Sequence, residues 1–263
     1  MKTLIDDYFD VLDEHPWIEG NEEHMYLDTE EYVTVGRGHL LQDAEAAKKL
    51  PFINGVRPAD QATIQKAYNE VKNKNKKRSI LFLTQENIDA LAKSDIKGKI
   101  DLLKKKFLKF DGFPRNIQKG LLEIWFNVRN AWKFHGLVHA IEESDWSQAA
   151  FESHRKTKSG ASGTYARNTL TAVWFCQAAF AAEKKNEKDI SDKWSFCDEF
   201  QEAVESQGWA TYDDLLTDLS KYQKKMSTDK NQEFIRKLKE IDKSFEAYRM
   251  KKNKPLATTA KKG

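Results

Sequence analysis

One short stretch of β-type sequence limits the folds open to a chain whose pattern is otherwise helical. The letters MYLDTEEYVTVG, residues 25–36, form two short β-rich runs around a polar turn. Elsewhere apolar residues recur at the spacing of one helical face, first within residues 4–12. The sequence therefore predicts an α+β fold, mostly α, in which a small β-hairpin accompanies many helices.

Breakers and caps divide this chain into the expected elements. Pro16 should end or kink the first helix. Asp60 can cap a helix that runs to about Lys72, and Thr84 can cap another. Beyond about Lys184 the composition shifts to charged helices.

The last expected helix carries a single apolar seam. Its residues are spaced four, three, four and three apart: Phe234, Leu238, Ile241, Phe245 and Tyr248. Because the seam covers only about two heptads, it favours packing within the chain over a dimeric coiled coil. We therefore expect a monomer.

Charge is distributed unevenly along the sequence. The first fifty residues contain thirteen Asp/Glu and four Lys/Arg, a net charge of −9, whereas the whole chain carries +3. A basic body behind an acidic front fits an anionic polymer as partner, such as a bacterial wall or nucleic acid. The alternative for any single Lys cluster is that it only covers the solvent-exposed face of a helix.

The two cysteines, Cys176 and Cys197, are too few for a disulfide framework and lack a metal-binding spacing. We expect two buried free thiols, although an oxidising compartment would allow a bridge. No segment reaches the ~18–20 apolar residues that span a bilayer, and the N-terminus lacks the apolar core of a signal peptide. We expect a chain made in the cytoplasm without a signal peptide, and no membrane insertion.

Three residues around the hairpin form a candidate catalytic site. Glu19 follows the first helix, Asp28 lies on one hairpin arm and Thr34 on the other. If the hairpin pairs about Glu31, the side chains of Asp28 and Thr34 emerge on one sheet face. Hydrolysis of a glycosidic bond needs one protonated carboxylic acid and one ionised carboxylate, and a hydroxyl can hold the water. The alternative is an acidic surface hairpin without chemistry.

The letters EGNEEHMYLDTEEYVTVGRGHLL closely resemble the active-site segment of the phage-type lysozymes, the T-even-type endolysins of glycoside hydrolase family 24. In that family a Glu-Gly ends the first helix, a Tyr-x-Asp-Thr-x-x-Tyr-x-Thr hairpin follows, and Gly-x-Gly-His-Leu comes next. The resemblance implies that Glu19 is the general acid, Asp28 the second carboxylate and Thr34 the residue that holds the attacking water. It also implies a lysozyme-like, two-lobed fold without metal or cofactor.

The resemblance extends more thinly over residues 10–175. It places Asp95 where the family has an aspartate paired with the motif histidine, here His39. We expect these two residues to hold the frame of the site rather than to react. Arg167 stands where the family keeps an arginine near the cleft. It is expected to steady Glu19 or the substrate, against the alternative of a plain surface role.

The resemblance suggests the organisation of residues 1–180, and the composition suggests that of the residues after them. The expected ranges are a lysozyme-like catalytic domain at 1–180, a small lobe at about 17–83, a helical lobe at about 84–180 that includes the N-terminal helix, a helical extension packed on the body at 181–250, and a basic disordered tail at 251–263. The family has no counterpart for the residues after about 180.

Three positions depart from the family pattern. Glu31 stands where the family usually has a glycine, and a positive φ there would cost about 1 kcal/mol. Arg37 adds a positive charge inside the Gly-x-Gly step, where we expect it to lie close to Asp28. Pro16 should disturb the helix that carries the acid. None of the three removes a catalytic group.

The resemblance implies a muramidase, which hydrolyses the β-1,4 bond between N-acetylmuramic acid and N-acetylglucosamine in peptidoglycan. An inverting mechanism is expected, with the two carboxyl groups roughly 6.5–9.5 Å apart. The setting is an antibacterial effector delivered by a secretion system, which would need an immunity protein, or a phage endolysin released through a holin. In either setting the enzyme acts on the cell wall, in the periplasm of a target or host cell.

Two other functions compete with the muramidase. A catalytically degenerate wall-binding protein could keep the lysozyme fold, and Pro16 and Glu31 are its best support. A helical nucleic-acid-binding protein is suggested only by the Lys clusters and the basic tail. Because that function leaves the spacing of Glu19, Asp28 and Thr34 unexplained, we expect no nucleic-acid partner.

Overall fold

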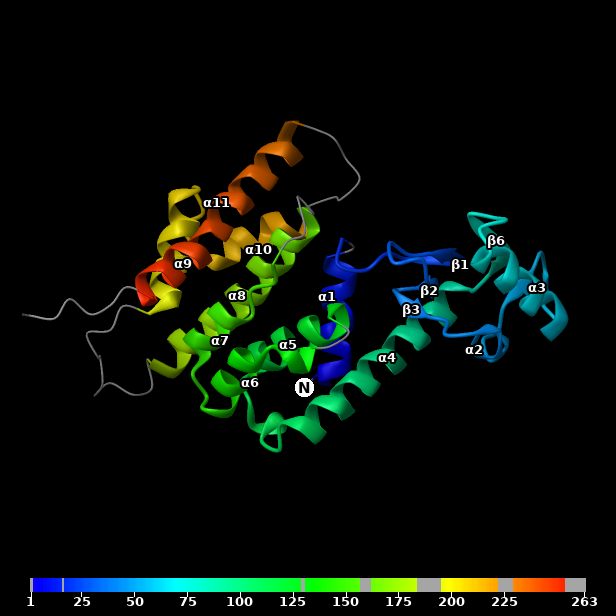
Figure 1. The fold of residues 1–263 in the computed structure, drawn as a ribbon, viewed down its shortest axis with the longest axis horizontal. Coiled ribbons are helices and arrows are strands. Elements are labelled where there is room, and N and C mark those ends of the chain that lie inside the picture. The colour runs from blue at the N-terminus through cyan, green and yellow to red at the C-terminus, as the bar shows by residue number, and fades with distance from the viewer. Residues whose placement is uncertain are drawn as a thin grey trace, which may run out of the picture. The chain divides into compact units, whose positions relative to one another are not determined.

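The structure, a computed structural model, describes residues 2–15, 17–128, 131–156, 162–183, 195–221 and 229–253. This part of the chain has the expected α+β fold, mostly α, with a small antiparallel sheet (Figure 1). Two compact units are distinguished, Met1–Leu108 and Lys109–Gly263, and each is described by itself. Within the described ranges, no helix is both long and apolar enough to cross a membrane.

The first unit combines four helices with the sheet. Its elements are α1 (Leu4–Glu14), β1 (Glu22–Leu27), β2 (Val33–Gly36), β3 (His39–Leu40), α2 (Ala44–Lys48), β4 (Ile53–Asn54), β5 (Arg57–Pro58), α3 (Gln61–Lys72), β6 (Arg78–Phe82) and α4 (Gln85–Lys106). The strand order is β3-β2-β1-β6-β4-β5, and every pair is antiparallel. The predicted hairpin is β1–β2, but the sequence did not predict the other strands. Three of them have two residues each, too short to produce an alternating pattern.

Local signals account for the helix boundaries of this unit. The side chain of Asp60 accepts a hydrogen bond from the backbone of Thr63 at 2.7 Å, and Thr84 caps α4 in the same way. Helix α1 ends at Glu14, where the N–H of His15 donates to Val11 O at 2.9 Å. The helix therefore ends before Pro16, which itself lies outside the described residues.

One face of the sheet is the apolar core of the first unit. Its fully or nearly buried members are Met25, Val33, Val35, Leu41, Ala47, Phe52, Ile64, Ala67, Tyr68, Val71, Leu81, Leu83 and Ile88. Helix α3 supplies four of them and packs on β6, β1 and β2. Because side chains alternate along a strand, Val33 and Val35 point into this core and Thr34 points to the opposite face. The opposite face carries the candidate site.

The second unit is helical in its described part. Its elements are a 3₁₀ turn at Phe110–Gly112, α5 (Arg115–Asn127), a 3₁₀ turn at Ala131–Lys133, α6 (His135–Glu142), α7 (Trp146–Glu152), α8 (Ser162–Glu183), α9 (Phe196–Ser206), α10 (Tyr212–Ser220) and α11 (Asp229–Lys252). Helix α8 packs against α5, α7, α10 and α11. The apolar seam of α11 faces α8 and α9, and Leu238, Ile241 and Phe245 are fully buried.

Cys176 and Cys197 form a disulfide bond between α8 and α9. The prediction of two free thiols was therefore wrong, although both residues are fully buried as expected. Their Cα atoms lie 5.2 Å apart, within the range that a bridge requires. Sequence spacing could not predict this approach, because it depends on how α9 packs in the helical unit, against α11, α7 and α10.

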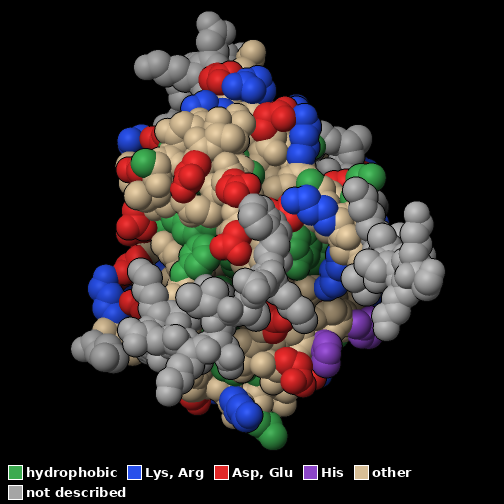
Figure 2. Space-filling view, turned by 90° about the vertical axis from the view of Figure 1, so that its left-hand side faces the viewer, with side chains coloured by type: hydrophobic (Ala, Val, Ile, Leu, Met, Phe, Trp, Pro, Cys, Tyr) green, Lys and Arg blue, Asp and Glu red, His purple; other side chains and the backbone are tan. Residues whose placement is uncertain are grey.

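The expected basic character does not extend over the whole second unit. The described sequences of α9 and α10 contain seven Asp or Glu residues and no Lys or Arg. Figure 2 shows acidic and basic side chains interspersed on the face that it presents. Lysines are concentrated elsewhere, for example in the last turn of α4.

Candidate active site

Glu19 lies in the turn that follows α1, and the two preceding residues hold this turn in place. Trp17 and Ile18 are buried, whereas Glu19 is only partly buried. Its carboxyl group lies against the backbone of Gly38, in the turn between β2 and β3. A Cβ atom added to Gly38 would lie 2.6 Å from Glu19 Oε2, and φ of Gly38 is +78°. Only glycine meets both requirements without strain, so the Gly-x-Gly step positions the acid.

Asp28 ends β1 and organises the hairpin turn. Its Oδ1 atom accepts hydrogen bonds from the backbone N–H groups of Glu30 and Tyr32, both at 2.9 Å. The turn is closed by Asp28 N to Tyr32 O at 2.9 Å and by Glu31 N to Asp28 O at 3.1 Å. Asp side chains commonly stabilise turns in this way. The two bonds to Oδ1 fix the carboxylate and leave Oδ2 directed toward Thr34.

The sequence had suggested that the hairpin pairs about Glu31. In the structure it pairs about Glu30. Tyr26 is opposite Thr34, and Leu27 is opposite Val33. Asp28 and Thr34 are therefore diagonal neighbours on one face rather than a direct pair. Asp28 pairs with Tyr32 rather than with Thr34, so the turn that it makes is two residues shorter than expected and the centre moves by one residue. The common face is nevertheless retained.

Thr34 is 3% exposed and lies beside Asp28. Its Oγ1 is 3.5 Å from Asp28 Oδ2 and 3.3 Å from Tyr32 O. Both distances are long for an O–H donor, and the single hydroxyl proton can serve only one acceptor at a time. The hydroxyl is therefore loosely held at the position where the proposed water would be bound. Its role in holding that water stays a prediction.

Glu31 has a φ of 65°, so the residue does occupy the left-handed region where the family has glycine. Its carboxylate forms an ion pair with Lys74, whose φ is 62°. The hydrogen bond from Lys74 lowers the pKa of Glu31. The turn keeps both backbone bonds to Asp28, so the strained Glu31 does not displace that carboxylate.

The expectation that Arg37 lies close to Asp28 was wrong. Its guanidinium forms an ion pair with Asp13, lies 3.7 Å from Asp89 and donates to Leu12 O at 3.4 Å. It also lies 5.1 Å from the ring centre of Phe9. These partners are on or beside α1 and α4, because the turn between β2 and β3 directs the side chain toward those helices. Arg37 thus anchors the turn that carries Gly38.

His39 and Asp95 form the expected pair. His39 Nδ1 lies 2.8 Å from Asp95 Oδ2, and both side chains are about a quarter exposed, 25% and 28%. The pair joins β3 to α4, directly after the turn that contains Gly38. This position fits a residue pair that holds the frame of the site.

Arg167 belongs to the second unit and is buried on α8, at 7% exposed. Its Nη1 donates to Glu123 Oε1 at 2.6 Å, and Arg155 Nη1 lies 3.2 Å from the same oxygen. The alternative of a plain surface role for Arg167 is therefore excluded. A contribution to Glu19 or to the substrate stays a prediction.

Sequence reasoning did not single out Tyr26, which lies opposite Thr34. Burial, followed by the negative charges of Glu19, Glu22 and Asp28, raises the pKa of the Tyr26 phenol to about 12. The charges of both candidate carboxylates, Glu19 and Asp28, therefore raise the pKa of the same side chain. The signal was available, because Tyr26 precedes Asp28 by two residues and must share its face.

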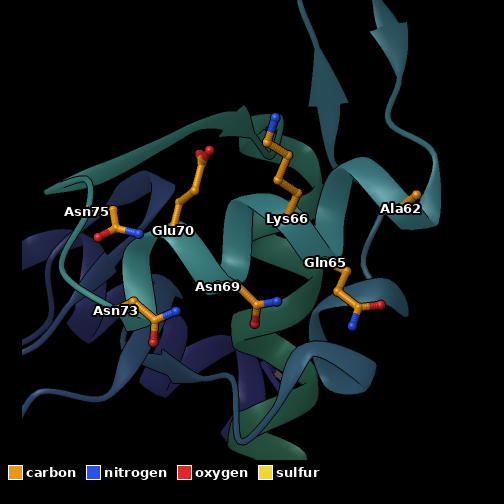
Figure 3. A pocket seen from close by; sticks show the side chains of 7 residues that line it. All are labelled: Ala62, Gln65, Lys66, Asn69, Glu70, Asn73 and Asn75. Carbon is orange, nitrogen blue, oxygen red and sulfur yellow. The ribbon is translucent and has the colours of Figure 1, made fainter.

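A hollow of about 410 Å³ lies along the exposed side of α3, away from the predicted residues. It is lined by Ala62, Gln65, Lys66, Asn69, Glu70, Asn73 and Asn75 (Figure 3). Lys66 and Glu70 project from one side of the helix in this view, and Gln65 and Asn69 project from the other. None of the six predicted site residues contributes to it.

The described residues contain no group of three or more His, Cys, Asp or Glu side chains that could hold a metal ion. The chain matches no protein-family model and no curated protein. The chemistry of the site must therefore be argued from its own residues.

Proposed function

We propose that the chain is a muramidase, which hydrolyses the β-1,4 bond between N-acetylmuramic acid and N-acetylglucosamine in peptidoglycan. One observation carries the proposal. Asp28 shares a sheet face with Thr34 and Tyr26, and the Tyr26 phenol responds to the charges of both Asp28 and Glu19. These observations support the arrangement that the resemblance to phage-type lysozymes implies.

The surroundings of the two carboxyl groups differ, as glycoside hydrolysis requires. Glu19 lies in a turn between buried apolar residues and the Gly38 backbone. Asp28 is fixed by two backbone N–H groups. In the proposed reaction Glu19 gives its proton to the leaving oxygen. Asp28 and Thr34 orient the water that attacks the opposite side of the sugar, Asp28 accepts the proton that this water loses, and the anomeric configuration is inverted.

The disulfide between Cys176 and Cys197 supports a site of action in an oxidising compartment, because such bonds persist in the periplasm and outside the cell. We propose delivery to the periplasm as an antibacterial effector, with an immunity protein in the producing cell. A phage endolysin is the second setting that fits this chemistry. Peptidoglycan is the only polymer that the proposal requires as a partner.

The test compares Glu19→Gln with the intact protein on purified peptidoglycan. We expect the intact protein to release muropeptides that end in N-acetylmuramic acid, and the variant to lose at least about 100-fold in rate, because Gln cannot donate the proton. Glu23→Gln is the matched control. It changes an exposed acid of the same segment, and it should retain full activity.

Mass spectrometry of the released muropeptides identifies the bond, and NMR of the first product identifies the anomer. Lysis by Glu19→Gln at the rate of the intact protein would show that the assignment is wrong. If the intact protein sediments with peptidoglycan but releases nothing, the chain is a wall-binding protein that keeps the fold without the activity.

A further inference from the structure

The proposed mechanism assigns no role to Tyr26, although this residue lies beside Thr34. It lies in β1, the strand between β2 and β6, opposite Thr34 on one side and Arg78 on the other. Since directly opposed side chains share a face, the Tyr26 ring lies next to Thr34 and two residues from Asp28. The ring is partly buried and partly exposed to solvent.

Burial and nearby negative charges keep the Tyr26 hydroxyl protonated. Burial and the charges of Glu19, Glu22 and Asp28 raise its pKa to about 12, and Arg78 opposes them only in part. A phenol with this pKa stays neutral over the whole pH range in which one carboxyl group could act as an acid and the other as a base. It can therefore donate a hydrogen bond throughout that range.

A comparison with Tyr68 shows how Tyr26 differs from a tyrosine whose hydroxyl bonds to the backbone. The hydroxyl of Tyr68 has structural partners, the backbone oxygens of Leu41 at 3.4 Å and Gln42 at 3.3 Å. No described residue forms a hydrogen bond with the Tyr26 hydroxyl. Tyrosine hydroxyls with a structural role usually have a protein partner. The Tyr26 hydroxyl has no such partner among the described residues, and it lies within the electrostatic reach of Glu19 and Asp28.

We propose that Tyr26 contacts the substrate, with its hydroxyl donating a hydrogen bond to an oxygen of the amino sugar bound between Glu19 and Asp28. The inference rests on the proposed function and adds a residue to the same site. The acceptor is a neutral hydroxyl, ring or acetamido oxygen of the sugar. An anionic acceptor is disfavoured, because the carboxylates of Glu22 and Asp28 would repel it.

The test pairs Tyr26→Phe with Tyr68→Phe. Tyr26→Phe removes a hydroxyl that has no hydrogen-bond partner among the described residues, so we expect unchanged thermal stability and a loss of about tenfold in kcat/KM on peptidoglycan. Tyr68→Phe removes a hydroxyl that bonds to the backbone, so we expect lower stability and unchanged activity below its unfolding temperature. The two variants should thus separate a loss of activity from a loss of thermal stability.

The pH profile distinguishes a substrate contact from an effect on the carboxyl groups. A lost contact lowers the rate of Tyr26→Phe by the same factor across the profile. A displaced profile would show that Tyr26 acts through Glu19 or Asp28, and would overturn the proposal. Full activity of Tyr26→Phe would overturn it as well, and so would a clear loss of thermal stability in that variant.

A binding measurement separates this inference from the proposed function. Calorimetry compares Glu19→Gln with the double variant Glu19→Gln/Tyr26→Phe, using a soluble N-acetylglucosamine oligosaccharide as probe. We expect the double variant to bind about tenfold more weakly. Weaker binding combined with no lysis by the intact protein would reject the muramidase but keep the sugar contact. Equal binding by the two variants would reject the contact.

Discussion

Gly38 is the residue on which the position of Glu19 depends most directly. Its φ is +78°, and a Cβ atom there would lie 2.6 Å from Glu19 Oε2. Gly38→Ala therefore introduces backbone strain of about 1 kcal/mol and pushes the carboxyl group out of its place. Because misplacing a reacting group by about 1 Å can cost on the order of 100-fold, we expect that loss in the rate of peptidoglycan lysis, measured by the fall in turbidity.

Gly55 provides a matched control for this substitution. Its φ is +64°, and nothing lies within 4 Å of a Cβ atom added there. Gly55→Ala should lower stability about as much as Gly38→Ala and leave lysis unchanged. Equal activity of the two variants would mean that Glu19 does not need the space above Gly38, or does not react.

At this scale the sequence could predict backbone requirements better than side-chain directions. Glu31 stands in a tight turn where the resembled family usually has a glycine, which indicated a positive φ. The φ of Glu31 is indeed 65°. The direction of Arg37 could not be predicted, because its partners Asp13 and Asp89 lie on or beside helices far away in sequence. Spacing from Asp28 could have identified Tyr26.

Among the elements, length decided which could be predicted. Strands β1 and β2 belong to one alternating stretch and were expected, whereas β3, β4 and β5 have two residues each. Strand β6 follows a basic run and becomes a strand by pairing with β1 and β4. Long helices with a capping residue, such as α4 behind Thr84, are set by local chemistry.

The disulfide between α8 and α9 leads to a prediction about these two elements. It closes a loop with a sequence separation of 21 residues, for which the loop-entropy model gives about 3 kcal/mol of stabilisation. We expect a reductant to lower the temperature at which the second unit unfolds, as measured by circular dichroism. The double variant Cys176→Ala/Cys197→Ala should be less stable, and a reductant should not change it further. An unchanged melting curve of the reduced natural chain would contradict the prediction.

At the scale of the whole molecule, sequence composition located a change near Lys184 but not the contacts that the later helices make. The structure groups helices α1 to α4 with the sheet in Met1–Leu108, and helices α5 to α11 in Lys109–Gly263. Contacts between residues far apart in sequence hold the second unit together, and no periodicity encodes them. One such contact joins Asn168 on α8 to Asp242 on α11, at 3.1 Å.

A buried charge network lies at the centre of the second unit. Glu123 has no exposed side-chain surface and binds Arg155 and Arg167. Arg155 also donates to Thr171 Oγ1 at 2.6 Å, and its backbone exchanges two hydrogen bonds of 3.0 Å with the Asn168 side chain. Helices α5 and α8 and the segment after α7 are thereby joined. The network continues from Asn168 to α11.

Removing the charge of Glu123 tests how far this unit depends on the network. Glu123→Gln leaves two buried guanidinium groups without their carboxylate, and breaking such a pair typically costs about 3–5 kcal/mol. We expect that loss in the free energy of unfolding of the second unit, measured by urea denaturation. Glu233→Gln breaks the exposed pair with Arg236 on α11, and it should leave the free energy of unfolding almost unchanged, because water screens that pair. Similar losses in both variants would show that the buried network does not hold α5 and α8 together.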